Sequence, residues 1–103
     1  MEEVKIERYL LNKGIPPQIK GFRYMTTAIQ LCQKNPDYLY SITKKLYPKV
    51  ASTHHDTYSK AERAMRHAIT FLGKSTTNSE FIGTALIELK ELYAIKKRGA
   101  KNV

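Results

Sequence analysis

Apolar positions recur every three or four residues along most of the chain, the spacing of helices that bury one face. The clearest stripe lies between Thr57 and Gly73 and consists of Ala61, Ala64, Met65, Ala68, Ile69 and Leu72. It predicts an amphipathic helix over about 59–72. Because a helix turns by about 100° per residue, its polar face carries Ser59, Arg63, Arg66 and Thr70, flanked by Glu62 and His67.

The same spacing predicts helices over about 2–13, 18–34, 38–47, 48–54 and 78–97. The core positions expected on them are Ile6, Tyr9, Leu10, Ile19, Phe22, Met25, Ile29, Cys32, Leu39, Ile42, Leu46, Val50, Ala51, Phe81, Ala85, Leu86, Leu89 and Tyr93. No β-hairpin signal appears. We therefore expect an all-α, compact domain of five to six helices.

Glycine, proline and capping residues mark the expected boundaries. Gly14 should end the first helix, and the Ile15-Pro16-Pro17 segment that follows should be a stiff turn. Gly21 costs a helix up to about 1 kcal/mol relative to alanine, which suggests a close backbone approach at that position. Pro48 should separate the 38–47 and 48–54 helices, because proline is favoured in a first helical turn.

A helix-turn-helix motif is predicted over about 48–73, from the short helix, a polar turn and the amphipathic helix with its basic outer face. Either Thr57 or Ser59 can cap that second helix. Two sequences, Ser59-x-x-Glu62 and Thr77-x-x-Glu80, match the capping box. We assign residues 1–95 to a single domain that contains the motif and 96–103 to a flexible basic tail.

The 103 residues include 18 Lys and Arg against 9 Asp and Glu, a formal charge of +9 that favours nucleic acid or an acidic membrane surface. No apolar run approaches the roughly 20 residues of a membrane span, and no signal-peptide pattern opens the chain. Cys32 has no disulfide partner and should be a small core residue. We expect a cytoplasmic protein.

The sequence argues against an enzyme and against a cofactor. It contains no nucleophile–base constellation, phosphate-cradling glycine loop or paired carboxylates. A metal site at His54-His55-Asp56 is not favoured, since consecutive histidines on a turn rarely converge on one ion. The seven tyrosines are scattered and form no platform for stacking single strands.

The polar face of the 59–72 helix suits the DNA major groove, where arginine pairs with guanine and glutamate accepts from cytosine. Arg63 and Arg66 are therefore candidate base readers. The alternative is a solvated face on which Glu62 and Arg66 form an i,i+4 ion pair. Glu62 could cap the helix, accept from cytosine or orient an arginine, and His67 could contact phosphate or water.

Six blocks, in order from about residue 4 to 89, resemble the C-terminal DNA-binding domain of the stage-zero sporulation protein A family, master response regulators of endospore formation. The blocks are Gly14-Ile15-Pro16, Ile19-Lys20-Gly21, Ser41-Ile42-Thr43-Lys44, Leu46-Tyr47-Pro48, Glu62-Arg63-Ala64 leading into Arg66-His67-Ala68-Ile69, and Thr77-Asn78-Ser79-Glu80-Phe81-Ile82. The resemblance implies a six-helix effector domain and a short asymmetric DNA target of the TGTCGAA type, often in tandem copies.

The resemblance also implies site residues. Base contacts fall on Glu62, Arg63 and Arg66, and contacts largely to phosphate fall on Ser59, Lys60 and His67. The block at Thr77, Asn78 and Ser79 would approach the DNA backbone, in agreement with the affinity of helix N-termini for anions. We add Lys74, in the preceding loop, as a further phosphate contact.

Three departures from the family pattern matter. The receiver domain that precedes this domain in the family is absent, so we expect no relief of inhibition by phosphorylation within this chain. A longer segment that helps to engage the RNA polymerase sigma subunit is replaced by residues 71–76, which puts that partner in doubt. Lys60 stands where the family usually has arginine, and lysine suits a phosphate but not a bidentate base contact.

The leading hypothesis is a sequence-specific regulator that binds double-stranded DNA, acting as a repressor, competitor or architectural protein. We expect a monomer in solution that can dimerise on tandem sites. The alternative is a protein-interaction module of the same fold that sequesters a regulator or a polymerase subunit. RNA binding is less favoured, because helix-turn-helix geometry suits B-form DNA.

Overall fold

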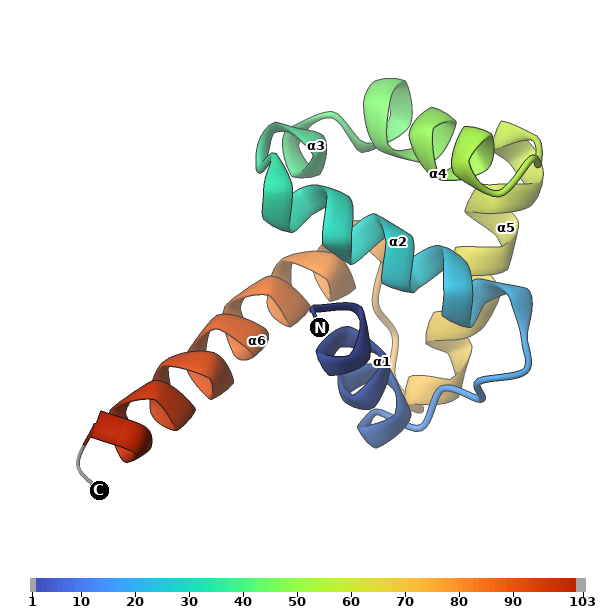
Figure 1. The fold of residues 1–103 in the computed structure, drawn as a ribbon. Coiled ribbons are helices and arrows are strands. Elements are labelled where there is room, and N and C mark those ends of the chain that lie inside the picture. The colour runs from blue at the N-terminus through green and yellow to red at the C-terminus, as the bar shows by residue number, and fades with distance from the viewer. Residues whose placement is uncertain (1, 102–103) are drawn as a thin grey trace.

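The computed structural model describes the backbone of residues 2–101 and the side chains of 3–92. These residues form helices and no strand, as predicted (Figure 1). The elements are α1 (Glu2–Asn12), α2 (Lys20–Lys34), α3 (Asp37–Tyr40), the π-helix η1 (Ile42–Leu46), α4 (Tyr47–Thr53), α5 (Tyr58–Ile69), the 3₁₀ turn η2 (Thr70–Leu72) and α6 (Asn78–Lys101).

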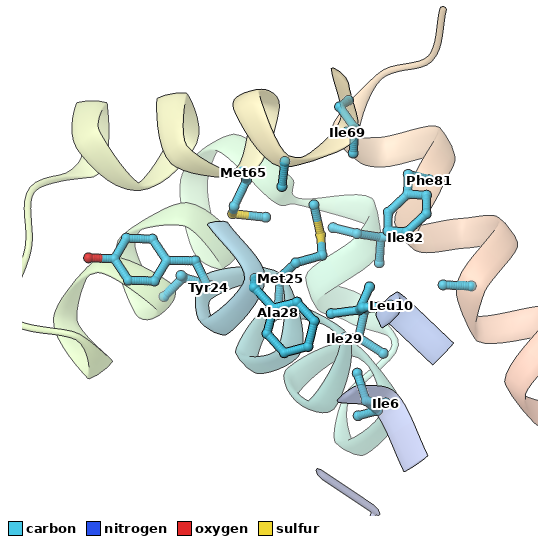
Figure 2. Packing of buried hydrophobic residues seen from close by; sticks show 14 of the residues in the cluster. Ile6, Leu10, Tyr24, Met25, Ala28, Ile29, Met65, Ile69, Phe81 and Ile82 are labelled. Atoms are coloured by element: carbon cyan, nitrogen blue, oxygen red, sulfur yellow. The ribbon is translucent and has the colours of Figure 1, made fainter. Parts of the chain in front are cut away.

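Helix α2 runs through the middle of the fold and contacts α1, α3, α4, α5 and α6 (Figure 1). Met25 and Ile29 on α2 are fully buried, in a cluster with Leu10, Met65 and Ile82 from three other helices (Figure 2). Most of the predicted core is confirmed. The exceptions are only partly buried: Ile19, Leu39, Ile42, Ala64, Leu72 and Leu86.

The segment predicted as one helix over 38–47 is divided, so that prediction is wrong. Ser41 leaves the helical conformation at φ −141°, ψ 54°, and its carbonyl then accepts from the amides of both Lys45 and Leu46. The bond to Leu46 spans five residues, which widens the turn into a π-helix. Pro48 does not separate two helices, because η1 continues directly into α4 with the proline in the first turn.

The ends of the other helices agree with the sequence signals to within a few residues. Gly14 follows α1 with φ +90°, a conformation that glycine adopts without strain. Helix α6 is longer than predicted and reaches Lys101 rather than 97. The predicted burial of Tyr93 and the side chains of the basic tail lie outside the described residues.

Polar contacts join α6 to α1. The Tyr9 hydroxyl donates a hydrogen bond to the Glu88 carboxylate, and the Lys13 ammonium lies 3.1 Å from the same oxygen. The Tyr9 hydrogen bond is the main reason that the pKa of Glu88 is lowered, with Lys13 second. The carboxylate therefore stays charged and holds the beginning of α6 against the domain, while the rest of α6 projects away (Figure 1).

The closest approach between α2 and α5 occurs at Gly21, as its place in the helix suggested. A Cβ added there would lie 2.2 Å from the carbonyl oxygen of Ala64 and 2.8 Å from the Cβ of Ala68. A real Cβ cannot occupy either distance, so any larger residue at 21 forces the two helices apart. The absent side chain thus sets the distance between α2 and α5.

We expect Gly21→Ala to lower the free energy of unfolding by about 1–3 kcal/mol or more, although alanine is the better helix former. Gly83→Ala in α6 is the matched control, since its nearest neighbour would be Leu39 at 3.9 Å. The control should be neutral or stabilising by up to about 1 kcal/mol. Urea denaturation measures both, and a Gly21→Ala protein as stable as wild type would contradict the packing argument.

Candidate nucleic-acid interface

Helix α5 has a fixed rotation about its own axis. Ala61, Met65 and Ala68 are fully buried against the core. Thr57 is the N-cap, and its side-chain oxygen accepts from the amide of Lys60 at 3.2 Å. Of the two possible caps Thr57 is thus the one used, and Glu62 takes no part in a capping box. The opposite face of α5 must then point to solvent.

The outward face of α5 carries most of the residues proposed for DNA contact. Ser59, Lys60, Arg63, Arg66 and His67 are all exposed, and Glu62 is half-buried. Among the described residues, no acceptor lies within hydrogen-bond or ion-pair distance of the Arg63 guanidinium. Arg63 therefore presents all five of its N–H donors to solvent.

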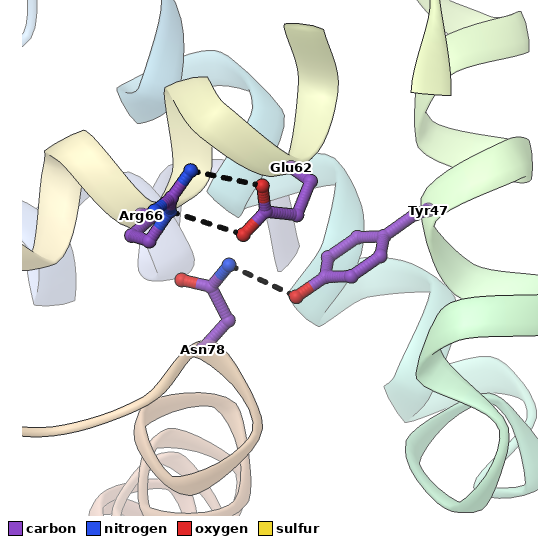
Figure 3. Close-up of polar contacts among 4 residues, drawn as sticks. All are labelled: Tyr47, Glu62, Arg66 and Asn78. Atoms are coloured by element: carbon purple, nitrogen blue, oxygen red, sulfur yellow. Dashed lines mark hydrogen bonds and ion pairs between the residues drawn. The ribbon is translucent and has the colours of Figure 1, made fainter. Parts of the chain in front are cut away.

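Arg66 is held by Glu62 one turn earlier on α5. Its Nη2 donates to Glu62 Oε1 at 3.2 Å, and its Nε lies 3.1 Å from Oε2 (Figure 3). The Arg66 side chain remains 63% exposed, whereas that of Glu62 is 30% exposed. An exposed i,i+4 pair is worth only about 0.3–0.5 kcal/mol, so its main effect is to fix where the guanidinium points.

The beginning of α6 forms the capping box that its sequence predicts. The Thr77 amide donates to Glu80 Oε1 at 2.9 Å, and the Glu80 amide donates to the Thr77 hydroxyl at 3.1 Å. Thr77 and Ser79 are exposed, but Asn78 is only 6% exposed. Its Nδ2 donates to the Tyr47 hydroxyl at 3.0 Å, so its side chain joins α6 to α4 (Figure 3).

A half-open groove of about 540 Å³ connects the two regions. Glu62 and Arg66 line it from α5, and Thr77, Asn78 and Ser79 line it from the start of α6. The opposite wall comes from α3, η1 and the start of α4, through Leu39, Tyr40, Ile42, Thr43 and Tyr47. The structure thus brings one edge of the α5 face next to the N-terminus of α6.

The remaining predicted residues lie outside this groove. Ser59, Lys60, Arg63 and His67 occupy the rest of the α5 face, where the His67 ring packs edge-on against Phe71. Lys74 is exposed in the loop before α6. Its charge contributes, after Tyr9 and Lys13, to the lowered pKa of Glu88, so Lys74 lies towards the α1–α6 contact.

Tyr47 is a residue whose role the sequence did not reveal. Its hydroxyl accepts from Asn78, and its ring meets the ring of Tyr58 edge-on at a centroid distance of 5.5 Å. Burial raises the pKa of this hydroxyl, so it remains protonated. Tyr47 therefore links the first turns of α4, α5 and α6. In the sequence, Tyr47 stands out only as part of the Leu46-Tyr47-Pro48 block.

The family model of the C-terminal domain of sporulation initiation factor Spo0A matches residues 6–82. The chain belongs to this family. The matched range includes all of α2 to α5, the groove and the capping box of α6. The protein is accordingly a DNA-binding effector domain of a sporulation regulator, and the resemblance noted in the sequence is confirmed.

In this family member the turn between α4 and α5 is held by side chains from α2. The Tyr24 hydroxyl donates to Asp56 at 2.6 Å, and the Tyr24 ring stacks on His54 at 4.5 Å. His54 Nε2 also lies 2.7 Å from the Thr27 hydroxyl. His55 adopts φ +55°. These residues fix the turn, and the described residues include no cluster of three or more metal-ligating side chains.

None of the helices in the described part of the chain combines the length and the apolar character that a membrane crossing would require.

Acid should weaken this turn through His54. Burial, and then the charge of Arg23, lower the pKa of His54 below its usual 6.5. A lowered pKa means that His54 binds a proton more tightly in the unfolded chain than in the folded protein. Neutral His54 therefore contributes its full share to the free energy of unfolding above pH 6.5, and this share is lost as the pH falls through the folded-state pKa. We expect the free energy of unfolding to fall as the pH decreases from neutral into the range below 6.5.

Urea denaturation at a series of pH values measures this dependence. His54→Gln should flatten the profile in that range. His55→Asn should change the slope much less, because the His55 charge is the last of the causes acting on the His54 pKa and asparagine tolerates the left-handed backbone at 55. The ordinary pKa of Asp56 lies below this window and is lowered further by Tyr24. An unchanged slope in His54→Gln would assign the acid sensitivity to another group.

Proposed function

We propose that the protein recognises a TGTCGAA-like element in double-stranded DNA by inserting α5 into the major groove. The observation that carries this proposal is Arg63. Its guanidinium is exposed and unpaired among the described residues, on a helix whose opposite face is fully buried. An arginine with free donors, on a helix that is itself held in place, is suited to pair with the O6 and N7 atoms of guanine.

Glu62 and Arg66 would read the neighbouring base pairs. The ion pair holds the Arg66 guanidinium on the DNA-facing side of α5 before DNA arrives, which reduces the entropy lost on binding. A carboxylate has about four acceptor sites, so Glu62 can orient Arg66 in the free protein and accept from a cytosine amino group once DNA is bound. Both of the base-proximal roles considered for Glu62 are therefore compatible with its position.

Phosphate contacts would come from both sides of α5. Ser59, Lys60 and His67 lie beside the base-reading residues, and Lys74 precedes α6. At the start of α6 we assign the hydroxyls of Thr77 and Ser79 to phosphate. Asn78 would contribute its backbone N–H, which has no partner within a first helical turn, rather than its buried side chain.

We further propose that the domain acts in the cytoplasm as a repressor, competitor or architectural protein. Only the η2 turn and a loop separate α5 from α6 in the structure. The longer segment of the family is thus reduced to this short connection, as the sequence indicates. This short connection supports DNA binding without contact to the sigma subunit. We also propose that the domain is a monomer in solution and can dimerise on tandem sites.

Arg63→Ala should weaken binding to a TGTCGAA duplex by about 1–3 kcal/mol and relax the preference at one base pair. Arg8→Ala, which removes the same charge from the exposed surface of α1, is the matched control and should retain the preference. Fluorescence anisotropy with duplexes altered at each position measures both. Equal affinity of wild type and Arg63→Ala would remove the basis of the proposal.

Lys60→Ala and Lys74→Ala should instead weaken binding to specific and random duplexes alike. Each lost phosphate contact should reduce the slope of log K against log salt by about 1. A salt titration of anisotropy measures the slopes. A changed sequence preference in either variant would contradict a phosphate role, whereas a nuclease-resistant protein partner without any specific DNA shift would favour the protein-interaction alternative.

A further inference from the structure

The groove beside α5 contains a buried acceptor that lacks a donor. Asn78 is 6% exposed, and its Nδ2 is used by Tyr47, but no described residue donates to its Oδ1. An unsatisfied buried carbonyl costs free energy, so native proteins rarely keep one without a use. The Tyr47 bond fixes the amide so that Oδ1 must face away from Tyr47.

Arg66 carries donors on the side of the groove that Oδ1 faces. Arg66 and Asn78 line the same groove, and Figure 3 shows Oδ1 turned to the side on which the Arg66 guanidinium lies. Arg66 bonds Glu62 through Nε and Nη2, which leaves further N–H groups free. Its side chain is 63% exposed and has rotatable bonds that can redirect the guanidinium.

We propose that Asn78 is a positioning residue for Arg66, and that the guanidinium donates to Asn78 Oδ1 when Glu62 turns towards DNA. This inference rests on the proposed function, because it assigns the step to the bound state. In the free protein Glu62 holds Arg66. Once Glu62 accepts from a base, Asn78 Oδ1 accepts a hydrogen bond from the Arg66 guanidinium and helps to orient it.

Glu62 and Asn78 differ in charge as acceptors for Arg66, so exchanging one for the other changes how strongly Arg66 attracts DNA. The Glu62 carboxylate neutralises Arg66 as well as orienting it, so a paired Arg66 attracts DNA less strongly. A neutral carbonyl orients the guanidinium through its dipole and leaves the full positive charge available to guanine or phosphate. The exchange also gives Oδ1 a hydrogen-bond donor. Arg66 therefore binds DNA most strongly only at sites where Glu62 accepts a hydrogen bond from a base.

The first test needs no DNA. Glu62→Ala should release Arg66 to Asn78 in the free protein, so Asn78→Ala should raise the unfolding equilibrium constant about tenfold more in that background than in wild type. Tyr47→Phe is the control, because it removes the same tie between α6 and α4 but keeps Oδ1. Its effect should differ between the two backgrounds by much less than that of Asn78→Ala. Equal effects of Asn78→Ala in both backgrounds would overturn the exchange.

The second test measures binding to the TGTCGAA duplex. Asn78→Ala should weaken binding about tenfold, and this loss should disappear in the Arg66→Ala background. The effect of Tyr47→Phe should depend on Arg66 much less than that of Asn78→Ala does. If Asn78→Ala weakens all duplexes equally and independently of Arg66, Asn78 is a phosphate or packing residue and the inference fails.

The two tests separate this inference from the proposed function. If wild type binds the duplex specifically through Arg63 but Asn78 and Arg66 show no coupling, only the exchange is wrong. If wild type binds no duplex specifically, the proposed function is wrong, and coupling in the DNA-free cycle would then show that Arg66 and Asn78 interact for another reason.

Discussion

The contact between Gly21 and the backbone of α5 is the constraint on which the exposed face depends. The Ala64 carbonyl and the Ala68 Cβ fill the space that a side chain at 21 would need, so α5 lies against α2 at a distance that only glycine permits. Ala61 and Met65 continue that contact into the core. A recognition helix benefits from such a restraint, since an error of about 1 Å in its position misplaces every hydrogen bond to the bases.

The charges on α5 are divided between two kinds of arginine. Arg63 has no partner among the described residues, so it keeps its charge and its mobility until it meets a ligand. Arg66 is pre-oriented by Glu62 and partly neutralised by it. In the proposed complex the carboxylate of Glu62 would add to discrimination, because a carboxylate at the DNA surface repels phosphates wherever its own base partner is missing.

The sequence predicted those features of the fold and the site that depend on residues close together in the chain. The stripe on α5, the Thr77–Glu80 capping box and the Glu62–Arg66 pair all involve residues three or four positions apart, and each forms as its spacing indicates. The break at Ser41 was missed because Leu39, Ile42 and Leu46 keep helical spacing across it. The Asn78–Tyr47 bond joins residues 31 positions apart, and no local pattern encodes it.

That non-local bond also decides how the candidate site works as a unit. Tyr47 contacts Asn78 at the start of α6 and Tyr58 at the start of α5, so the proposed phosphate-binding end and the proposed base-reading helix share one buried ring. Neither can shift without displacing the other. A DNA phosphate bound at Thr77 and Ser79 would therefore fix the depth at which Arg66 and Glu62 enter the DNA major groove. Contact with the DNA phosphates and recognition of the bases would then require the same placement of the domain on DNA.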